Sequence, residues 1–235
     1  MSSNDGAKEN LFSNSAYENI DPKITTEPNS ASIIAAMADS TGYKISSAAA
    51  VVDGFWNYIE NRKEHWRKDT NCLSIPGFGS FIIKPSAVKH FKSNKIGKIK
   101  ILGQEFIYRN KNGQWSKAPN PSVRILFRLT PKINLSEPNK YLQNTLSSSA
   151  SHWTDQWNDK GVKYLSLKRK ISVYIHNHSA IPLKEIDTLL ACFIAITLKS
   201  ITTNKKTSFA RRGNFHLNKQ VTFQAFKRFK ERLLS

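Results

Sequence analysis

One short stretch, Leu73-Ser-Ile-Pro-Gly-Phe-Gly-Ser-Phe-Ile-Ile83, limits most strongly what this chain can fold into. It reads as an apolar strand, a Gly-Phe-Gly corner and a second strand. Gly77 and Gly79 permit backbone angles that other residues avoid, so the chain can reverse tightly between the two strands. The pattern predicts a β-hairpin with a structural corner of Gly77, Phe78, Gly79 and Phe81, in which both aromatic rings point into a core.

Two amphipathic helices are predicted before this hairpin. Ser30 or Ser32 can cap the first helix, which runs through Ile33–Ala38 and ends at Gly42. Ser46 can cap the second helix, whose apolar residues recur at helical spacing. This apolar stripe, which predicts a core face and not a ligand site, comprises Val51, Val52, Phe55, Trp56 and Ile59.

A basic segment follows the hairpin, from Lys84 to Arg128, with eleven basic residues and one acid, Glu105. Residues 105–109 alternate like a strand, residues 110–113 suit a hairpin turn, and Ser122–Leu129 alternates as a returning strand. A short closing helix is expected at 131–135. Within this segment we predict contacts to nucleic acid or to an acidic partner from Lys84, Lys89, Lys92, Lys95, Lys98, Lys100, Arg109, Lys111, Lys117 and Arg124.

The second half repeats this order of elements. Residues 171–176 stand for the first helix, and Pro182 opens a second helix that carries a long apolar stripe. Phe209–Phe215 then overlays Ile75–Phe81, and the overlay adds Gly213 and Phe215 to the structural corner residues, with Arg211 in place of Gly77. Only residues 218–220 separate this strand from the next, so the second copy lacks the basic arm. A closing helix is expected over 225–234, with Phe226, Phe229 and Leu233 on one face.

The charge balance indicates an acidic partner. The chain has 36 Lys and Arg against 17 Asp and Glu, a formal charge of +19. Such an excess favours nucleic acid, a membrane surface or an acidic protein face as the partner. Cys72 and Cys192 lie in apolar runs and are expected to be core residues in a reducing compartment. No signal sequence and no apolar run of about 18 residues is found, so we expect no membrane span.

The remaining segments are expected to connect or extend the two copies. Residues 1–30 are rich in Ser, Asn and Glu and read as an extended arm, which is either a solvated tail or a segment ordered against a neighbouring subunit. Residues 136–167 read as a linker. The predicted domains are therefore 31–135, with the arm, and 168–235, without it.

Nothing in the sequence supports catalysis. His176 and His178 point in different directions on a helix, and no cluster of Cys or carboxylate residues accompanies them. Paired carboxylates, a phosphate-binding glycine loop and a nucleophile elbow are also missing. We predict a non-enzyme with no cofactor, no metal and no small-molecule substrate.

On Ile75–Phe81 and the helices before it, the chain resembles the HU and integration host factor (IHF) family. The resemblance implies an α+β fold of two HU/IHF-like domains, each with two helices, an antiparallel sheet and a short closing helix. In that family two chains share one core and each contributes a DNA-embracing arm. The two copies here would either fold back as an intramolecular pseudo-dimer or each pair with another chain. The family's arm-tip proline is absent from the turn, since Asn120-Pro121 lies at the base of the returning strand.

Two functions follow from this resemblance. One is an architectural protein of the cytoplasm and nucleoid that binds double-stranded DNA without sequence preference. The other is a structural protein, similar to IHF-like virion proteins of tailed, crAss-like phages, assembled in the host cytoplasm into a tail or neck ring of identical copies and other virion proteins. We favour the structural role, because loss of one arm forfeits symmetric wrapping of DNA. In either role the second half would contribute Lys205, Lys206, Arg211, Arg212 and Lys219.

Overall fold

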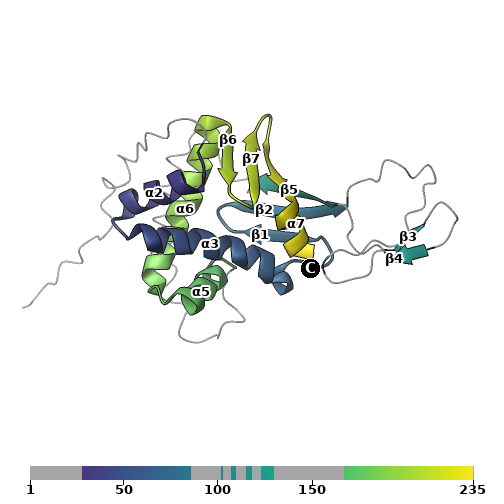
Figure 1. Ribbon diagram of the computed structural model, residues 1–235, viewed down its shortest axis with the longest axis horizontal. Helices are drawn as coiled ribbons and strands as arrows, with labels where there is room; N and C mark the ends of the chain where they lie inside the picture. The colour runs from purple at the N-terminus through teal and green to yellow at the C-terminus, as the bar shows by residue number, and fades with distance from the viewer. Residues whose placement is uncertain are drawn as a thin grey trace, which may run out of the picture.

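The computed structural model describes residues 28–85, 102, 107–109, 115–117, 123–129 and 167–234. They form an α+β fold, as predicted, with helices and two separate three-stranded antiparallel sheets (Figure 1). The first half contains α2 (Ser30–Thr41), α3 (Ile45–Asn61), the 3₁₀ turn η1 (Lys63–His65), β1 (Cys72–Ile75), β2 (Gly79–Pro85), β3 (Ile107–Arg109), β4 (Trp115–Lys117) and β5 (Val123–Leu129). The second contains α5 (Leu167–Ser179), α6 (Leu183–Asn204), β6 (Lys206–Phe209), β7 (Gly213–Leu217), β8 (Val221–Ala225) and α7 (Lys227–Leu234).

The two sheets have the same topology, with strand orders β1-β2-β5 and β6-β7-β8. In the first sheet Phe81 lies opposite Phe127, and in the second Phe215 lies opposite Phe223. The connection between the second and third strands of the sheet is long only in the first half, where β3 and β4 pair with each other beyond the ends of β2 and β5 (Figure 1). The predicted closing helix at 131–135 and most of the linker lie outside the described residues.

The helix starts differ from the predicted caps. Asn29 caps α2, because its side-chain oxygen accepts bonds from the backbone N–H groups of Ala31 and Ser32, and the Ser32 hydroxyl completes a capping box. Lys44 precedes α3 without a side-chain cap, so Ser46 lies inside that helix. The expected end of the first helix is confirmed, since Gly42 has a left-handed φ of 69°.

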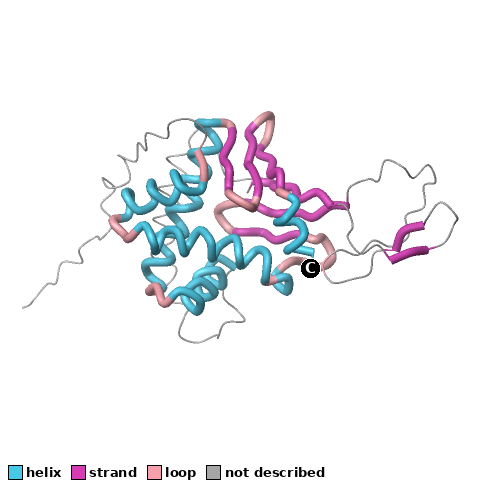
Figure 2. The backbone as a smooth tube through the Cα atoms, in the orientation of Figure 1, coloured by secondary structure: helices cyan, strands magenta, loops and turns pink. Residues whose placement is uncertain are grey.

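Both halves contribute to one hydrophobic core. Helices of the two halves pack together, α2 against α6 and α3 against α5. These four helices lie on one side of the molecule, and the sheets and α7 lie on the other (Figure 2). At the centre, Trp56 of α3 is 1% exposed and contacts rings of both sheets. Its neighbours, with centroids 5.2–6.4 Å away, are Phe55, Phe81, Phe209, Phe215, Phe223 and Phe229. Of the two pairing modes left open by the sequence, the structure has the fold-back within one chain.

α6 is apolar because it runs through this core. By length and composition it is the one helix among the described residues that could cross a membrane, because its most apolar 18-residue stretch has a mean hydropathy of 1.5. However, 72% of that stretch is buried within the protein. A core helix passes the same test, and α6 packs against α2, α3 and α5. Burial inside the fold accounts for its composition.

The repeat extends to individual backbone interactions. Gly42 N–H donates to the Ala38 carbonyl, and Ala180 N–H donates to that of His176 at the same spacing in the second half. The strand turns match as well, since Gly77 and Arg211 both have left-handed φ angles, 76° and 64°. Further matched pairs are Thr41 with Ser179, Ala48 with Ile186, Asn71 with Lys205, and Ile83 with Leu217.

The corner residues adopt the predicted structure, but the reason for a glycine at position 79 differs from the predicted one. Phe78, Phe81 and Phe215 are buried, and Gly77 has the expected left-handed angle. Gly79 is required for space instead. A Cβ there would lie 2.5 Å from Cζ of Phe127 and 2.6 Å from the backbone oxygen of Arg128.

The ends of the described body also correct two expectations. Phe226 precedes α7 and is 39% exposed, so only Phe229 and Leu233 form the buried face of that helix. Residues 28–30 of the predicted N-terminal arm lie against the same chain, because Ser208 N–H donates to the Pro28 carbonyl over 2.9 Å. Residues 1–27 lie outside the described residues.

Candidate polyanion-binding surface

The outer face of the first sheet carries cations because its strands alternate between core and solvent. In β5 the side chains at 123, 125 and 127 are buried, whereas Arg124, Leu126 and Arg128 are exposed. Lys84 of β2 is exposed on the same face. Two residues predicted as contact sites, Lys84 and Arg124, are therefore brought together.

Lys84 and Arg124 are direct cross-strand partners in the β2–β5 ladder. Like charges placed opposite each other in a sheet destabilise it. No Asp or Glu occurs in any of the described strands to offset this repulsion. An anion bound on this face would relieve it.

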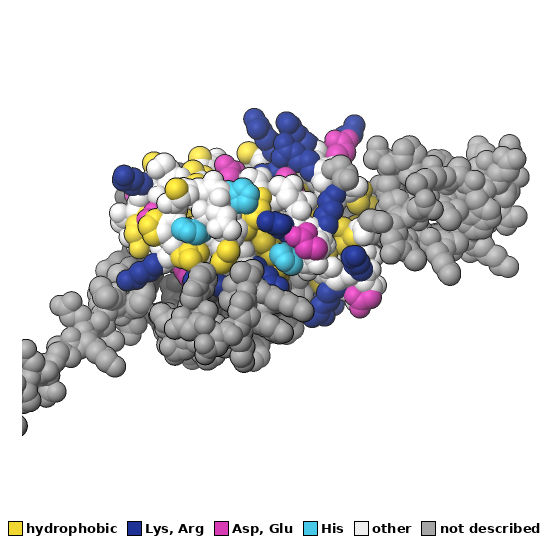
Figure 3. All heavy atoms as spheres, turned by 90° about the horizontal axis from the view of Figure 1, so that it is seen from below, with side chains coloured by type: hydrophobic (Ala, Val, Ile, Leu, Met, Phe, Trp, Pro, Cys, Tyr) yellow, Lys and Arg dark blue, Asp and Glu magenta, His cyan; other side chains and the backbone are white. Residues whose placement is uncertain are grey.

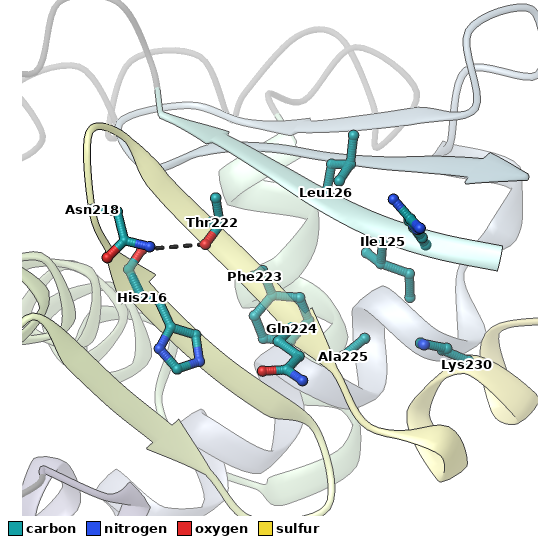
Figure 4. A pocket seen from close by; sticks show the side chains of 10 residues that line it. Ile125, Leu126, His216, Asn218, Thr222, Phe223, Gln224, Ala225 and Lys230 are labelled. Carbon is teal, nitrogen blue, oxygen red and sulfur yellow. Dashed lines mark hydrogen bonds between the residues drawn. The ribbon is translucent and has the colours of Figure 1, made fainter. Parts of the chain in front are cut away.

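A groove of about 490 Å³ lies where β5 of the first half meets β8 of the second (Figure 4). Leu126 and Phe223 supply apolar surface, and Gln224 adds an amide. Arg124 and Lys230 bring one cation from each half to its lining. Both sheets therefore line one groove, which is mainly apolar and has a cation from each half.

The predicted cluster of the second half is divided between two ends of its sheet. Lys205, Lys206 and Lys219 lie at one end, because β6 begins next to the turn between β7 and β8. Arg211 lies at the other end, in the turn between β6 and β7. The five residues do not form one patch.

Arg212 is not available to an external partner. It is buried and forms an ion pair with the Glu60 carboxylate and a 2.9 Å hydrogen bond with Asn57, both on α3. Its predicted role in contacting nucleic acid or an acidic partner is wrong. The guanidinium instead joins the second half to the first.

The remaining predicted contact residues come from the segment of the chain between β2 and β5. Arg109 and Lys117 belong to β3 and β4, where they pair with Trp115 and Ile107. The other predicted cations are outside the described residues, namely Lys89, Lys92, Lys95, Lys98, Lys100 and Lys111.

Sequence reasoning missed the cations of α7. Its apolar residues Phe229 and Leu233 face the core, and the opposite side of the helix is basic. Figure 3 shows Lys and Arg side chains (dark blue) gathered along one edge of the described body. The density of basic residues in the closing segment could have revealed this face, which carries Lys227, Arg228 and Lys230. Arg232 of the same helix is instead paired with Glu60.

A second hollow, about 420 Å³, lies between the end of α3 and α5. Tyr58 and His65 both line it, and the Tyr58 hydroxyl is 2.5 Å from Nδ1 of His65. Burial, followed by the charge of Glu64, raises the pKa of the Tyr58 phenol, and burial lowers the pKa of the His65 imidazole. Both groups are therefore predominantly neutral at pH 7.

No group of three His, Cys, Asp or Glu residues in the part of the chain that the structure describes could hold a metal ion. Cys192 is buried, and burial raises the pKa of its thiol to about 12. Cys72 is only partly buried, so the expectation of two core cysteines holds for Cys192 alone.

Comparisons with protein-family models, curated proteins and solved structures find no match for this chain.

Proposed function

We propose that the chain is a non-enzymatic assembly protein built on the HU/IHF plan and a component of a tailed-phage particle, in a tail or neck ring. Its neighbours would be further copies of itself and other virion proteins. Two tandem copies of one element order, folded around a common core, support the HU/IHF part of this proposal.

The asymmetry of the body is the observation that carries the assembly role. Residues 86–122 separate β2 from β5, whereas residues 218–220 separate the equivalent β7 and β8. A clamp that wraps DNA from both sides needs an arm on each half. A subunit that reaches its neighbour in a ring needs only one projection, which a one-armed body provides.

The first expected result concerns assembly. The purified full chain should form closed oligomers, with a mass by light scattering that is a multiple of the chain mass and rings visible by electron microscopy. A variant whose residues 86–122 are replaced by the 218–220 turn should remain folded but lose the oligomer. A chain that stays monomeric at all concentrations and bends a short duplex at nanomolar concentration would contradict the assembly role.

Binding of double-stranded DNA is a second candidate, favoured by the opposed Lys84 and Arg124 on strands without acids. Phosphates would lie along the outer face of the sheets and neutralise these cations. Contacts of this kind carry no base information, so binding would be independent of sequence. It can also coexist with an assembly role in a particle that contains packaged DNA.

The second expected result concerns salt. Binding of a short duplex should weaken as salt rises, and the variant K84A/R124A should reduce the slope of log affinity against log salt by roughly 1.8, since each lost phosphate contact accounts for about 0.9. The matched control K44A/K184A removes two exposed cations at the starts of α3 and α6 and should leave the slope unchanged. Equal slopes for both variants in a mobility-shift titration would exclude the sheet face as the binding surface.

A further inference from the structure

The carboxylate of Glu60 is the most buried acidic group in the described residues, with 2% of its side chain exposed. It lies on α3 of the first half and pairs with two arginines of the second half. Arg212 approaches one of its oxygens, and Nη1 of Arg232 lies 3.3 Å from the other. Asn57 accepts a further hydrogen bond from Arg212. The network exists only when the second half is packed on the first.

The repeat shows which residues occupy the positions equivalent to Glu60 and Arg212 in the opposite halves. The spacing that relates Gly42 to Ala180 and Ala48 to Ile186 relates Phe55 to Phe193, and these two rings meet with centroids 5.0 Å apart. The same spacing along the helices sets Leu198 at the position of Glu60. In the strand turns Phe78 stands at the position of Arg212, because Phe78 N–H and Arg212 N–H make the same turn hydrogen bond. Leu198 and Phe78 are both buried.

We infer that these four residues determine which halves can pair. The repeat relates the two halves by a pseudo-two-fold axis, so each contact between a helix and a strand turn of the other half has an equivalent on the opposite side of the axis. On one side the helix residue and the turn residue are the charged pair Glu60 and Arg212. On the other side the equivalent residues are apolar, Leu198 on the helix and Phe78 in the turn. A first-half surface therefore fits a second-half surface and rejects another copy of itself.

The alternatives are unfavourable because each buries a charge without its partner. Two first halves paired together would place Phe78 where Arg212 stands, against Glu60, on both sides of the axis. Two second halves would place Arg212 against Leu198 twice. An uncompensated buried charge is far more costly than a buried ion pair or an apolar pair. The same reasoning holds whether the two halves come from one chain or from two copies of this chain.

The test uses three variants of the full chain that copy the apolar side onto the charged side. E60L leaves the buried Arg212 without a carboxylate, and R212F leaves the buried Glu60 with only the partly exposed Arg232. Each should raise the unfolding equilibrium constant in urea by roughly a hundredfold or more. The double variant E60L/R212F restores a matched apolar pair and should recover at least tenfold relative to either single variant. Arg232 is 40% exposed and can turn toward solvent in all three variants.

A mixing experiment tests specificity directly. E60L chains and isotope-labelled R212F chains are combined in urea and refolded together. Exchange of halves gives every surface a matched partner, so native mass spectrometry should find the two chains in a 1:1 ratio and the product should be more stable than either variant refolded alone. The measured quantity is the ratio of E60L to R212F chains and not the number of chains in an oligomer. The result is therefore independent of whether the wild type forms rings.

The control is E231L, which removes the exposed partner of Lys227 at 3.8 Å and should leave stability unchanged. Single variants as stable as the wild type, a double variant no better than the worse single variant, or a refolded mixture with random composition would each overturn the inference. If the single variants do not fold at all, the double variant and the mixture still decide it.

Discussion

Replacing Trp56 by alanine is expected to destabilise the whole chain by about 3–5 kcal/mol, the usual loss for a buried aromatic side chain. The Trp56 ring is 1% exposed and contacts phenylalanines of both sheets and of α7. Its removal leaves a cavity that neither half can close alone. For a chain of this length the melting temperature should fall by roughly 6–20 °C, in calorimetry or circular dichroism.

The shape of the transition matters as much as its midpoint. Because Trp56 belongs to a core shared by both halves, W56A should move one cooperative transition to lower temperature. The control I45A truncates an apolar side chain that is 60% exposed and should have little effect. A variant in which one transition moves while a second stays fixed would show that the halves unfold independently.

Replacing Gly79 by valine is expected to cost about 3 kcal/mol or more and to unfold the first sheet. The nearest atoms to a new Cβ are Cζ of Phe127 at 2.5 Å and the backbone oxygen of Arg128 at 2.6 Å. Phe127 is fixed in the core, and the segment from Val123 to Leu129 is fixed by pairing with β2. The strands would have to separate to make room.

Two further variants show whether glycine is required at position 79 because there is no space for a Cβ or because of its backbone angle. G79A adds the same Cβ and should be nearly as destabilising as G79V, as measured by urea unfolding. G42A is the control, because Gly42 has a left-handed φ of 69° but no atom within 4 Å of a new Cβ, so it should cost only about 1 kcal/mol. A stability of G79A equal to wild type would refute the steric account.

The order of elements could be predicted because each carries its own local signal. Residues close together in the sequence determine the i, i+3, i+4 stripe of α3, the alternation of β5 and the turn at Gly77. The helix caps were assigned less well, since Asn29 and Ser32 act together and either serine alone also fits the pattern. The reason for Gly79 lies on a partner strand distant in sequence, where local reasoning cannot find it.

The candidate surface was predictable in part for the same reason. Lys84 and Arg124 fall on the solvent side of strands with clear alternation, and their exposure follows from it. Arg212 is buried because it pairs with Glu60, a residue of the other half. No sequence spacing within the second half indicates that pairing. The basic side of α7 was overlooked because its apolar residues already accounted for the helix.

The position of Trp56 has a consequence for synthesis of the chain. Most of the rings that cover it belong to β6, β7, β8 and α7, which are translated after the first half. Until they emerge from the ribosome, the first half presents an uncovered aromatic face. A nascent chain that ends before the second half is therefore prone to aggregation and a substrate for chaperones, because the first half alone cannot bury its apolar surface.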